Sequence, residues 1–260
     1  MTIYQFDGTM DGLLTAVFDA FALHDQPEQL VTTGDALPLF CDRIYQVTTD
    51  EEKAQRVWSG LEKRLPCETM KLISVSWLSE QRELITPLFL FVCKIFRQPA
   101  GTTGIERNYA DADVLTVTNI ARRVLHEQLR MKQFIRFQKA KDGTYLAVVS
   151  PDHNVLPLIT DHFSDRFNDQ PWLIYDAKRH YGYYYDGKTV IRITFEDEVA
   201  VPFNLENGKL NDEVLSNDDQ LLQDLWRTYF KAICIKERMN PRKQLNDMPR
   251  RYWKYMTEKQ

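Results

Sequence analysis

Apolar and polar positions alternate at the start of the chain and then recur at helical spacing. The opening IYQF alternates like a short strand and ends at Asp7-Gly8, a turn pair. Thr9 follows at the position of a helix N-cap, and the apolar residues after it keep helical spacing as far as Phe21. Residues 43–48 (RIYQVT) alternate again. We therefore predict a strand, a helix and a second strand in this order.

Helical periodicity dominates the chain from Thr49 onward. Thr49 and Glu52 have the spacing of a capping box, which opens a helix. Further helices are predicted near residues 68–78, 83–97 and 111–131. The last of these helices has an apolar face made of Val114, Val117, Ile120, Ala121, Val124 and Leu125. The first half of the chain is therefore predicted to be rich in helix.

The pattern changes from helical to alternating at Lys132. Two alternating runs flank Lys141-Asp142-Gly143, which predicts a β-hairpin. A short helix is predicted over residues 156–167. The remaining predicted elements are strands at residues 172–177, 181–185 and 189–195, a helix at 213–237 and a basic helical tail.

The order of these elements predicts an α+β fold. It would consist of a helix-rich N-terminal part, a central antiparallel sheet of about five strands with a short helix after the first hairpin, and C-terminal helices. No repeat or linker interrupts the chain, so we predict one α+β domain over residues 1–260. Its parts would be a helix-rich segment 1–131, a sheet unit 132–205, and the C-terminal helices and basic tail 212–260.

The composition is that of a soluble globular protein, with 43% hydrophobic and 27% charged residues. No apolar run reaches the roughly 20 residues that a membrane helix needs. The N-terminus lacks the basic and apolar regions of a signal peptide, so we expect a cytoplasmic protein. The four cysteines form no CxxC pair. The sequence therefore predicts no structural zinc site, no iron–sulfur site and no cofactor.

Charge is unevenly distributed along the chain. The net charge is −4, yet residues 236–260 contain eight Lys or Arg against three Asp or Glu. A basic tail on an acidic body predicts a local anion-binding surface. Arg250 and Arg251 would contact phosphates there, while Trp253 stacks on exposed bases. The alternative is an amphipathic helix that docks Tyr252 and Trp253 on the body and leaves its charges in solvent.

Ionisable side chains are concentrated around the predicted hairpin and short helix. On that helix, His162 and Arg166 fall at the borders of the buried stripe, as an i,i+4 pair suited to a phosphate or carboxylate. The alternative is structural: Arg166 extends its charge into solvent, and His162 bonds a backbone carbonyl. Two further arginines, Arg136 and Arg179, are candidates for binding the same anion.

The same region supplies candidates for general acid–base catalysis. His153 or His162 would be the base, and Asp152 or Asp176 would orient it. Asp152 precedes a helix start, where an aspartate is also expected as a cap. The separation of the two histidines matches no standard pair of metal ligands, so no metal site is predicted. The sequence also lacks GxGxxG, P-loop, GxSxG and HExxH motifs.

Several motifs together resemble those of one bacterial family. They are FDGTMDGLLTAVFDAF, EQLRMKQFIRF, YLAVVSPDHNVLPLITDHFSDRF, QPWLIYDAKR and MPRRYWKYM, and they span nearly the whole chain. The members of that family are described as DNA metabolism or DNA repair proteins of unknown biochemical activity. The positions that match the polar residues of the family motifs are Asp7, Arg136, Asp152, His153, His162, Arg166, Asp176, Arg179, Arg250 and Trp253.

The resemblance also implies partners. Members of the family are typically encoded beside a radical SAM protein assigned to DNA modification or repair, and related domains occur fused to a uracil-DNA glycosylase-like domain. This implies a role on damaged or modified DNA. The chain itself has no CxxxCxxC motif, so any radical SAM activity would belong to the partner.

Three functions are compatible with the sequence. The first is a DNA-binding accessory protein that presents nucleic acid to a radical SAM partner. The second is an enzyme that acts on DNA or nucleotides by His/Asp general acid–base chemistry. The third is a scaffold that binds the partner and has no affinity for DNA. A structure separates the second function from the others, because catalysis needs the central ionisable residues to meet in an open pocket.

Overall fold

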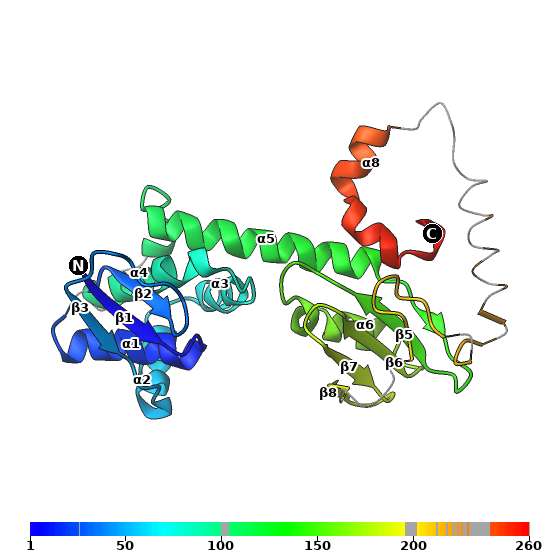
Figure 1. The fold of residues 1–260 in the computed structure, drawn as a ribbon, viewed down its shortest axis with the longest axis horizontal. Helices are drawn as coiled ribbons and strands as arrows, with labels where there is room; N and C mark the ends of the chain where they lie inside the picture. Colours follow the sequence, from blue (N-terminus) through cyan, green and yellow to red (C-terminus); the bar gives the residue numbers. More distant parts are fainter. Residues whose placement is uncertain are drawn as a thin grey trace. The chain divides into compact units, whose positions relative to one another are not determined.

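The computed structural model describes residues 1–25, 27–99, 104–195, 202–211, 213–216, 218, 219, 221, 223, 225, 228 and 240–259. The chain divides into two compact units, Met1–Leu125 and His126–Gln260 (Figure 1). Both units combine helices with a sheet, which confirms the α+β class. The single domain predicted over residues 1–260 stays a prediction. In the described residues, no helix is long and apolar enough to cross a membrane.

The first unit contains a parallel sheet of three strands. These are β1 (Thr2–Phe6), β2 (Gln29–Thr32) and β3 (Arg43–Gln46), and β1 lies in the middle (Figure 1). The pattern of alternation predicted β1 and β3. It missed β2, which is only four residues long and pairs with β1 across the intervening helix. The N-terminal part is therefore not purely helical.

Helix α1 (Met10–Ala22) begins directly after β1, as the sequence predicts. Thr9 is its N-cap, because the Thr9 hydroxyl accepts a hydrogen bond from the Gly12 amide at 2.9 Å. Asp7 fixes this cap in turn. Its carboxylate accepts bonds from the Thr9 amide at 2.9 Å and the Thr9 hydroxyl at 2.7 Å, and also one from the Thr49 hydroxyl at 2.8 Å. The turn thus joins the end of β1 to the segment after β3.

The predicted capping box at Thr49 and Glu52 is wrong by one residue. Helix α2 (Glu51–Glu62) is capped by Asp50, whose carboxylate accepts the Lys53 amide at 3.1 Å. Thr49 lies one residue before the cap, and its hydroxyl donates to Asp7. Aspartate is at least as good an N-cap as threonine, so Asp50 serves in this position.

The other helices of the first unit match the predicted periodicity. They are α3 (Cys67–Trp77), α4 (Arg82–Arg97) and the first part of α5 (Ala112–Phe134). The short 3₁₀ turn η1 (Ile105–Arg107) was not predicted. Val114, Val117 and Ile120 on α5 join the core of this unit, as predicted. Leu125 was placed on the same buried face, but it is 39% exposed.

The second unit contains a five-stranded sheet in the order β4-β5-β6-β7-β8. Its strands are β4 (Gln138–Lys139), β5 (Tyr145–Val149), β6 (Trp172–Asp176), β7 (Tyr181–Tyr185) and β8 (Val190–Ile193). The predicted hairpin is confirmed as β4 and β5. The predicted antiparallel sheet is wrong in one pair, since β5 and β6 run parallel. The helical connection between them carries the chain back before β6 begins, which makes the sheet mixed.

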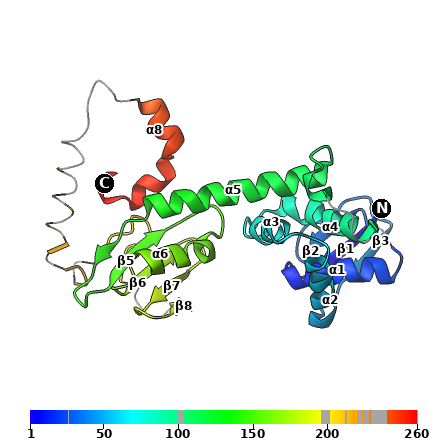
Figure 2. The same ribbon diagram turned by 180° about the vertical axis from the view of Figure 1, so that it is seen from behind.

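That connection covers one face of the sheet. The helix predicted over residues 156–167 is a 3₁₀ turn, η2 (Leu156–Leu158), followed by α6 (Thr160–Arg166). Both ribbon views show α6 against the sheet (Figures 1 and 2), and the Phe163 ring lies 6.2 Å from the ring of Trp172. The opposite face is covered by a second cluster that includes Tyr175, Phe203, Leu210 and Tyr255. Strand β6 is consequently buried along its whole length.

The C-terminal segment 240–259 folds onto the second unit. It forms α8 (Pro241–Asp247), η4 (Arg250–Tyr255) and η5 (Thr257–Lys259). Tyr252 is 4% exposed and Met256 is fully buried, so these two side chains anchor the segment. The docking predicted as the alternative for this tail is confirmed for Tyr252, while Trp253 is half-buried. Most of the helix predicted at 213–237 lies outside the described residues.

Candidate functional site

The parallel strands β5 and β6 end side by side, and a polar turn follows each of them. Val149 at the end of β5 pairs in register with Asp176 at the end of β6. The turn after β5 is Pro151-Asp152-His153-Asn154, here called the PDHN turn. Ligand sites of open sheets with parallel strands commonly lie at the carboxyl ends of those strands. This edge is therefore where the fold would present a site.

Glu127 on α5 holds the PDHN turn from one side. Its carboxylate accepts the backbone amides of Asp152 at 3.0 Å and His153 at 2.8 Å. The Glu127 residue is only 1% exposed. A buried carboxylate that accepts two backbone amides is strongly oriented, and bonds to an ionised acceptor are stronger than neutral ones. Glu127 thus holds the turn through its backbone amides.

Lys178 and Arg179 hold the same turn from the side of β6. The Lys178 ammonium donates to the Asp152 carbonyl oxygen at 2.9 Å. The Arg179 guanidinium donates to the carbonyl oxygens of Pro151 at 3.1 Å and Asp152 at 2.9 Å. A carboxylate therefore binds two backbone amides of the PDHN turn, and two cationic side chains bind its carbonyl oxygens. Hydrogen bonds from both sides leave this stretch of backbone little freedom to move.

Asp176 positions Arg179. Its carboxylate is fully buried and accepts the Arg179 guanidinium at 2.8 Å and the Lys178 amide at 2.9 Å. Burial raises the pKa of the Asp176 carboxyl, and the Arg179 charge and the neighbouring amides oppose that rise. Asp176 is thus part of a buried ion pair that orients Arg179.

The C-terminal segment closes the network. The Arg251 guanidinium donates to Glu127 at 3.1 Å and also binds the Asp152 carboxylate. The Tyr252 hydroxyl donates to Glu127 at 3.0 Å, and burial raises the pKa of that phenol. Glu127 therefore joins three segments far apart in the sequence: α5, the PDHN turn and η4.

The four candidates for catalysis have different surroundings. The carboxylates of Asp152 and Asp176 are bound by Arg251 and Arg179, respectively. His153 is buried at 8% exposure. His162 on α6 is half-buried, with its ring 5.1 Å from that of Phe163. Both aspartates are thus paired with arginines, and a catalytic role for the four residues stays a prediction.

His162 and Arg166 were both predicted to be partly buried, but they lie in different environments. Burial, followed by the charges of Lys132 and Arg166, lowers the pKa of His162. Arg166 is exposed, and its guanidinium lies 5.7 Å from the centre of the Phe167 ring. The expected partly desolvated pair is therefore wrong for Arg166, because the last turn of α6 turns this side chain toward solvent.

The predicted anion-binding arginines fall into two groups. Arg136, Arg179 and Arg251 are held in ion pairs within the second unit. For example, Arg136 makes a two-nitrogen contact with Glu258 at 3.0 and 2.7 Å, and the Glu258 side chain is 1% exposed. Arg166 and Arg250 are exposed and form the second group, while Arg251 is exposed but ion-paired. Only the second group presents its charge to solvent without an ion pair between described residues.

Trp253 lies beside two cations of its own segment. The Arg250 guanidinium is 5.9 Å and the Lys259 ammonium 5.0 Å from the centre of its ring system. Its indole N–H donates to the Met248 carbonyl oxygen at 3.1 Å. The ring is therefore oriented by local contacts, and cations cover it where a base was predicted to stack.

Sequence reasoning missed Glu127, Lys178, Tyr252 and Glu258 as members of this network. Glu127 left a signal: it follows Val124 and precedes Met131 on the buried stripe of α5, where a charged side chain needs a partner. No sequence feature pointed to Glu258, because its partner Arg136 is far away in the sequence. Among the described residues, no three His, Cys, Asp or Glu side chains are placed to hold a metal ion.

The fold and this site define an α+β protein whose second unit clamps the PDHN turn and the C-terminal segment in one ion-pair network. Residues 83–258 match the family described as a domain of unknown function, DUF4130. Since this match covers more than half of the chain, the protein belongs to that family. Comparisons with curated proteins and with solved structures gave no match.

Proposed function

We propose that the protein is a DNA-binding accessory protein of DNA metabolism or repair, and that its C-terminal segment contacts the phosphates. The observation that carries this proposal is the exposure of Arg242, Lys243 and Arg250 on a segment anchored by Tyr252 and Met256. Cations fixed to a folded surface lose less entropy on binding than cations on a free tail. The segment would act as a positively charged platform.

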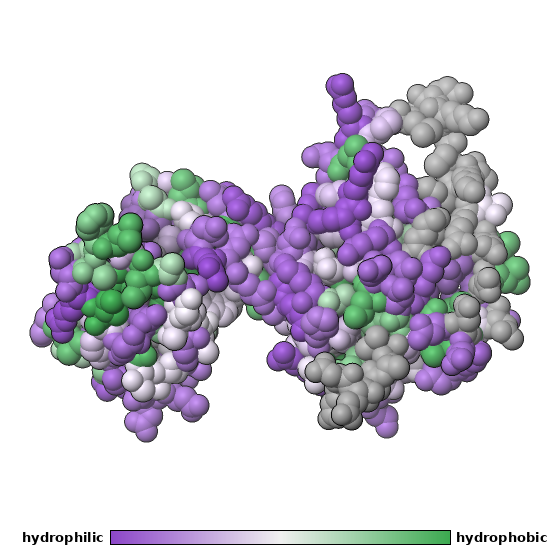
Figure 3. Space-filling view, in the orientation of Figure 1, coloured by the Kyte–Doolittle hydropathy of each residue, from purple (hydrophilic) through white to green (hydrophobic). Residues whose placement is uncertain are grey.

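The local charge balance supports this proposal. Between residues 240 and 259 there are six Lys or Arg and two Asp or Glu. One of the two acids, Glu258, is buried against Arg136 and does not offset the exposed cations. In Figure 3 the surface around α8 is hydrophilic on the face shown. Such a surface attracts phosphates through sequence-independent, salt-sensitive contacts.

Binding is better supported than catalysis by His/Asp acid–base chemistry. In acid–base catalysis, Asp152 or Asp176 would have to orient a histidine. Asp152 and Asp176 are instead bound by Arg251 and Arg179. These contacts account for both carboxylates as parts of a scaffold. The rigid scaffold in turn supports the segment that carries the exposed cations.

The partners belong to the same proposal. We propose that the protein assists a radical SAM protein of DNA modification or repair in the cytoplasm, and that a uracil-DNA glycosylase-like protein acts on the same DNA. The resemblance of the PDHNVLP, QPWLIYD and MPRRYWKYM motifs to the family supports this. Co-purification with the radical SAM protein should survive removal of DNA by nuclease if the contact is direct.

A binding assay with labelled oligonucleotides tests the DNA proposal. The wild type should bind both single- and double-stranded DNA at low salt, and Arg242→Ala/Arg250→Ala should bind more weakly. The matched control is Lys188→Ala/Arg192→Ala, which removes two exposed cations from the β7–β8 hairpin of the same unit. Equal weakening by both double variants, or no binding by the wild type, contradicts the proposal.

A further inference from the structure

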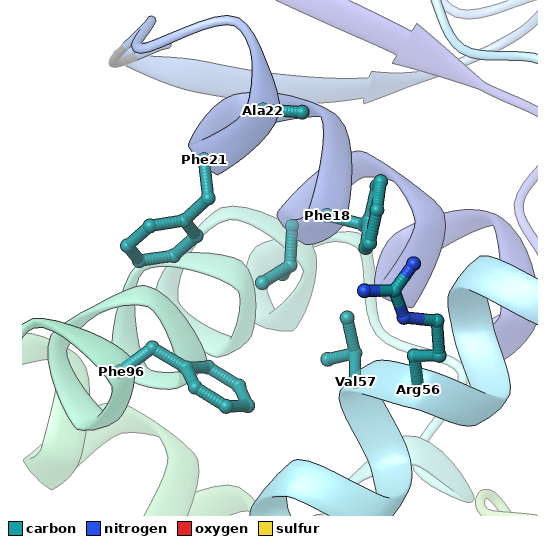
Figure 4. Close-up of a pocket in the computed structure, with 7 residues that line it drawn as sticks. Phe18, Phe21, Ala22, Arg56, Val57 and Phe96 are labelled. Atoms are coloured by element: carbon teal, nitrogen blue, oxygen red, sulfur yellow. The ribbon is translucent and has the colours of Figure 1, made fainter. Parts of the chain in front are cut away.

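The first unit has an apolar pocket between three helices. Its volume is about 450 Å³. Helix α1 supplies four of the lining residues, α2 two and α4 one (Figure 4). The lining residues are Val17, Phe18, Phe21, Ala22, Arg56, Val57 and Phe96. Pockets of this size, lined by apolar and aromatic side chains with a single charged group, are typical binding sites.

The aromatic walls of this pocket are held in place. Figure 4 shows Phe21 and Phe96 on one side of the hollow and Phe18 with Arg56 on the other. The rings of Phe21 and Phe96 are 6.1 Å apart in an edge-to-face arrangement. The Phe96 ring packs so closely on α2 that a β-carbon added to Gly60 would lie 2.9 Å from it. The walls are therefore formed before any ligand binds.

The charge beside the pocket is positive. Arg56 is the one charged side chain among the lining residues, all of which the structure describes, and it is exposed. Its guanidinium lies 5.0 Å from the centre of the Phe18 ring. A second guanidinium, that of Arg64, lies 5.3 Å from the centre of the Phe96 ring. A ligand that brings a carboxylate would complement these charges.

The exposure of the pocket favours a protein segment as the occupant. Phe21 is 39% exposed and the neighbouring Leu23 is 49% exposed, so large apolar side chains stand at the rim. Exposed apolar patches of this kind mark contact surfaces. The volume of the pocket exceeds that of one side chain. A groove between helices suits the apolar face of another helix, whose buried apolar side chains lie about one turn apart.

We propose that this pocket docks an acidic amphipathic helix of a partner protein. Two apolar side chains of the helix, one turn apart, enter between Phe18, Phe21 and Phe96. An Asp or Glu beside them pairs with Arg56. This inference goes beyond the proposed DNA binding, because it concerns the first unit and its test contains no DNA in the primary measurement.

Selection from a displayed library of random 16-residue peptides tests this inference. The full-length protein is the bait, and the Ala22→Trp variant is used for counter-selection because the new indole fills the pocket. Ala22 is exposed at the last residue of α1, so the change leaves the core intact. Enriched peptides should carry apolar residues at i and i+3 or i+4 together with Asp or Glu. They should bind Ala22→Trp at least about tenfold more weakly.

Reversing the charge of Arg56 gives a more specific test. With Arg56→Glu as bait, the enriched peptides should carry Lys or Arg in place of the acids. Lys63→Glu, an equal change at the exposed C-cap of α2 outside the pocket, should still select acidic peptides. If Ala22→Trp does not fold, Phe21→Ala, which removes the exposed wall, replaces it as the counter-selected variant.

Three outcomes would overturn the inference. The first is enrichment that does not distinguish wild type from Ala22→Trp. The second is acidic peptides that bind Arg56→Glu as well as they bind wild type. The third is displacement of the peptides from the wild type by a single-stranded oligonucleotide that does not itself bind Ala22→Trp, which would make the pocket a nucleic-acid site.

Discussion

Glu127 shows how much one buried side chain can organise. It accepts hydrogen bonds from two backbone amides of the PDHN turn, from Arg251 and from Tyr252. This buried acceptor is stabilising because two of its donors, the His153 amide and the Tyr252 hydroxyl, are buried with it and would be left unsatisfied without it. The sequence revealed the residue as a charge on an apolar stripe but did not reveal its partners.

Replacing Glu127 tests this role. Glu127→Ala should lower the free energy of unfolding by about 3 kcal/mol, because the buried His153 amide and Tyr252 hydroxyl lose their acceptor. Glu127→Gln keeps the shape and one acceptor oxygen, so it should cost less. Urea denaturation measures both. Limited proteolysis should also cut within residues 240–259 faster in Glu127→Ala, and an unchanged cleavage rate would contradict the network.

His162 gives a prediction about pH. Burial and the charges of Lys132 and Arg166 lower its pKa below the ordinary 6.5, so between the two values the unfolded chain binds more protons. The free energy of unfolding should therefore rise with pH across that window and level off above about pH 6.5. An NMR titration of the ring should give a pKa below 6.5 in the wild type.

Two neighbouring charges provide the controls for His162. Arg166→Ala removes a positive charge and should raise the pKa of the imidazole, whereas Asp165→Asn removes a negative charge and should lower it further. A wild-type pKa at or above 6.5, or shifts of the opposite sign in the two variants, would show that this ring is not in the environment described.

At the scale of elements, the helices and the β4–β5 hairpin were predictable, whereas the parallel pairing of β5 with β6 was not. The helices α1 to α5 follow from apolar spacing and caps, which are local properties of the chain. The direction of β6 relative to β5 depends on where α6 returns the chain, and alternation within a strand carries no information on that. The short strand β2 was missed for the same reason, because its pairing with β1 cannot be read from the pattern within the strand.

The turn between β1 and α1 gives an element-scale prediction. A β-carbon on Gly12 would lie 2.3 Å from the Asp7 carboxylate. Gly12→Ala should therefore destabilise the protein, although alanine normally stabilises a helix by roughly 1 kcal/mol relative to glycine. Thermal or urea unfolding measures the difference. A gain in stability would mean that Asp7 does not hold the cap as described.

At the scale of the whole molecule, the sequence predicted the α+β class and located the basic segment. It did not predict which of the arginines present their charge. Arg136 and Arg251 are paired with acids far away in the sequence, and Arg179 is paired with Asp176 three residues before it. Arg242 and Arg250 are exposed and belong to no ion pair between described residues. Charge counting finds a basic segment, but only folding decides which of its cations are left for a ligand.

The exposed cations of residues 240–259 make the salt dependence of DNA binding the most direct test of the account. Plotted against the logarithm of salt concentration, the logarithm of the binding constant should fall steeply for the wild type. The slope should be shallower by about 2 for Arg242→Ala/Arg250→Ala and unchanged for Lys188→Ala/Arg192→Ala. A wild-type affinity that does not depend on salt, or equal slopes for all three proteins, would contradict the proposed DNA contact.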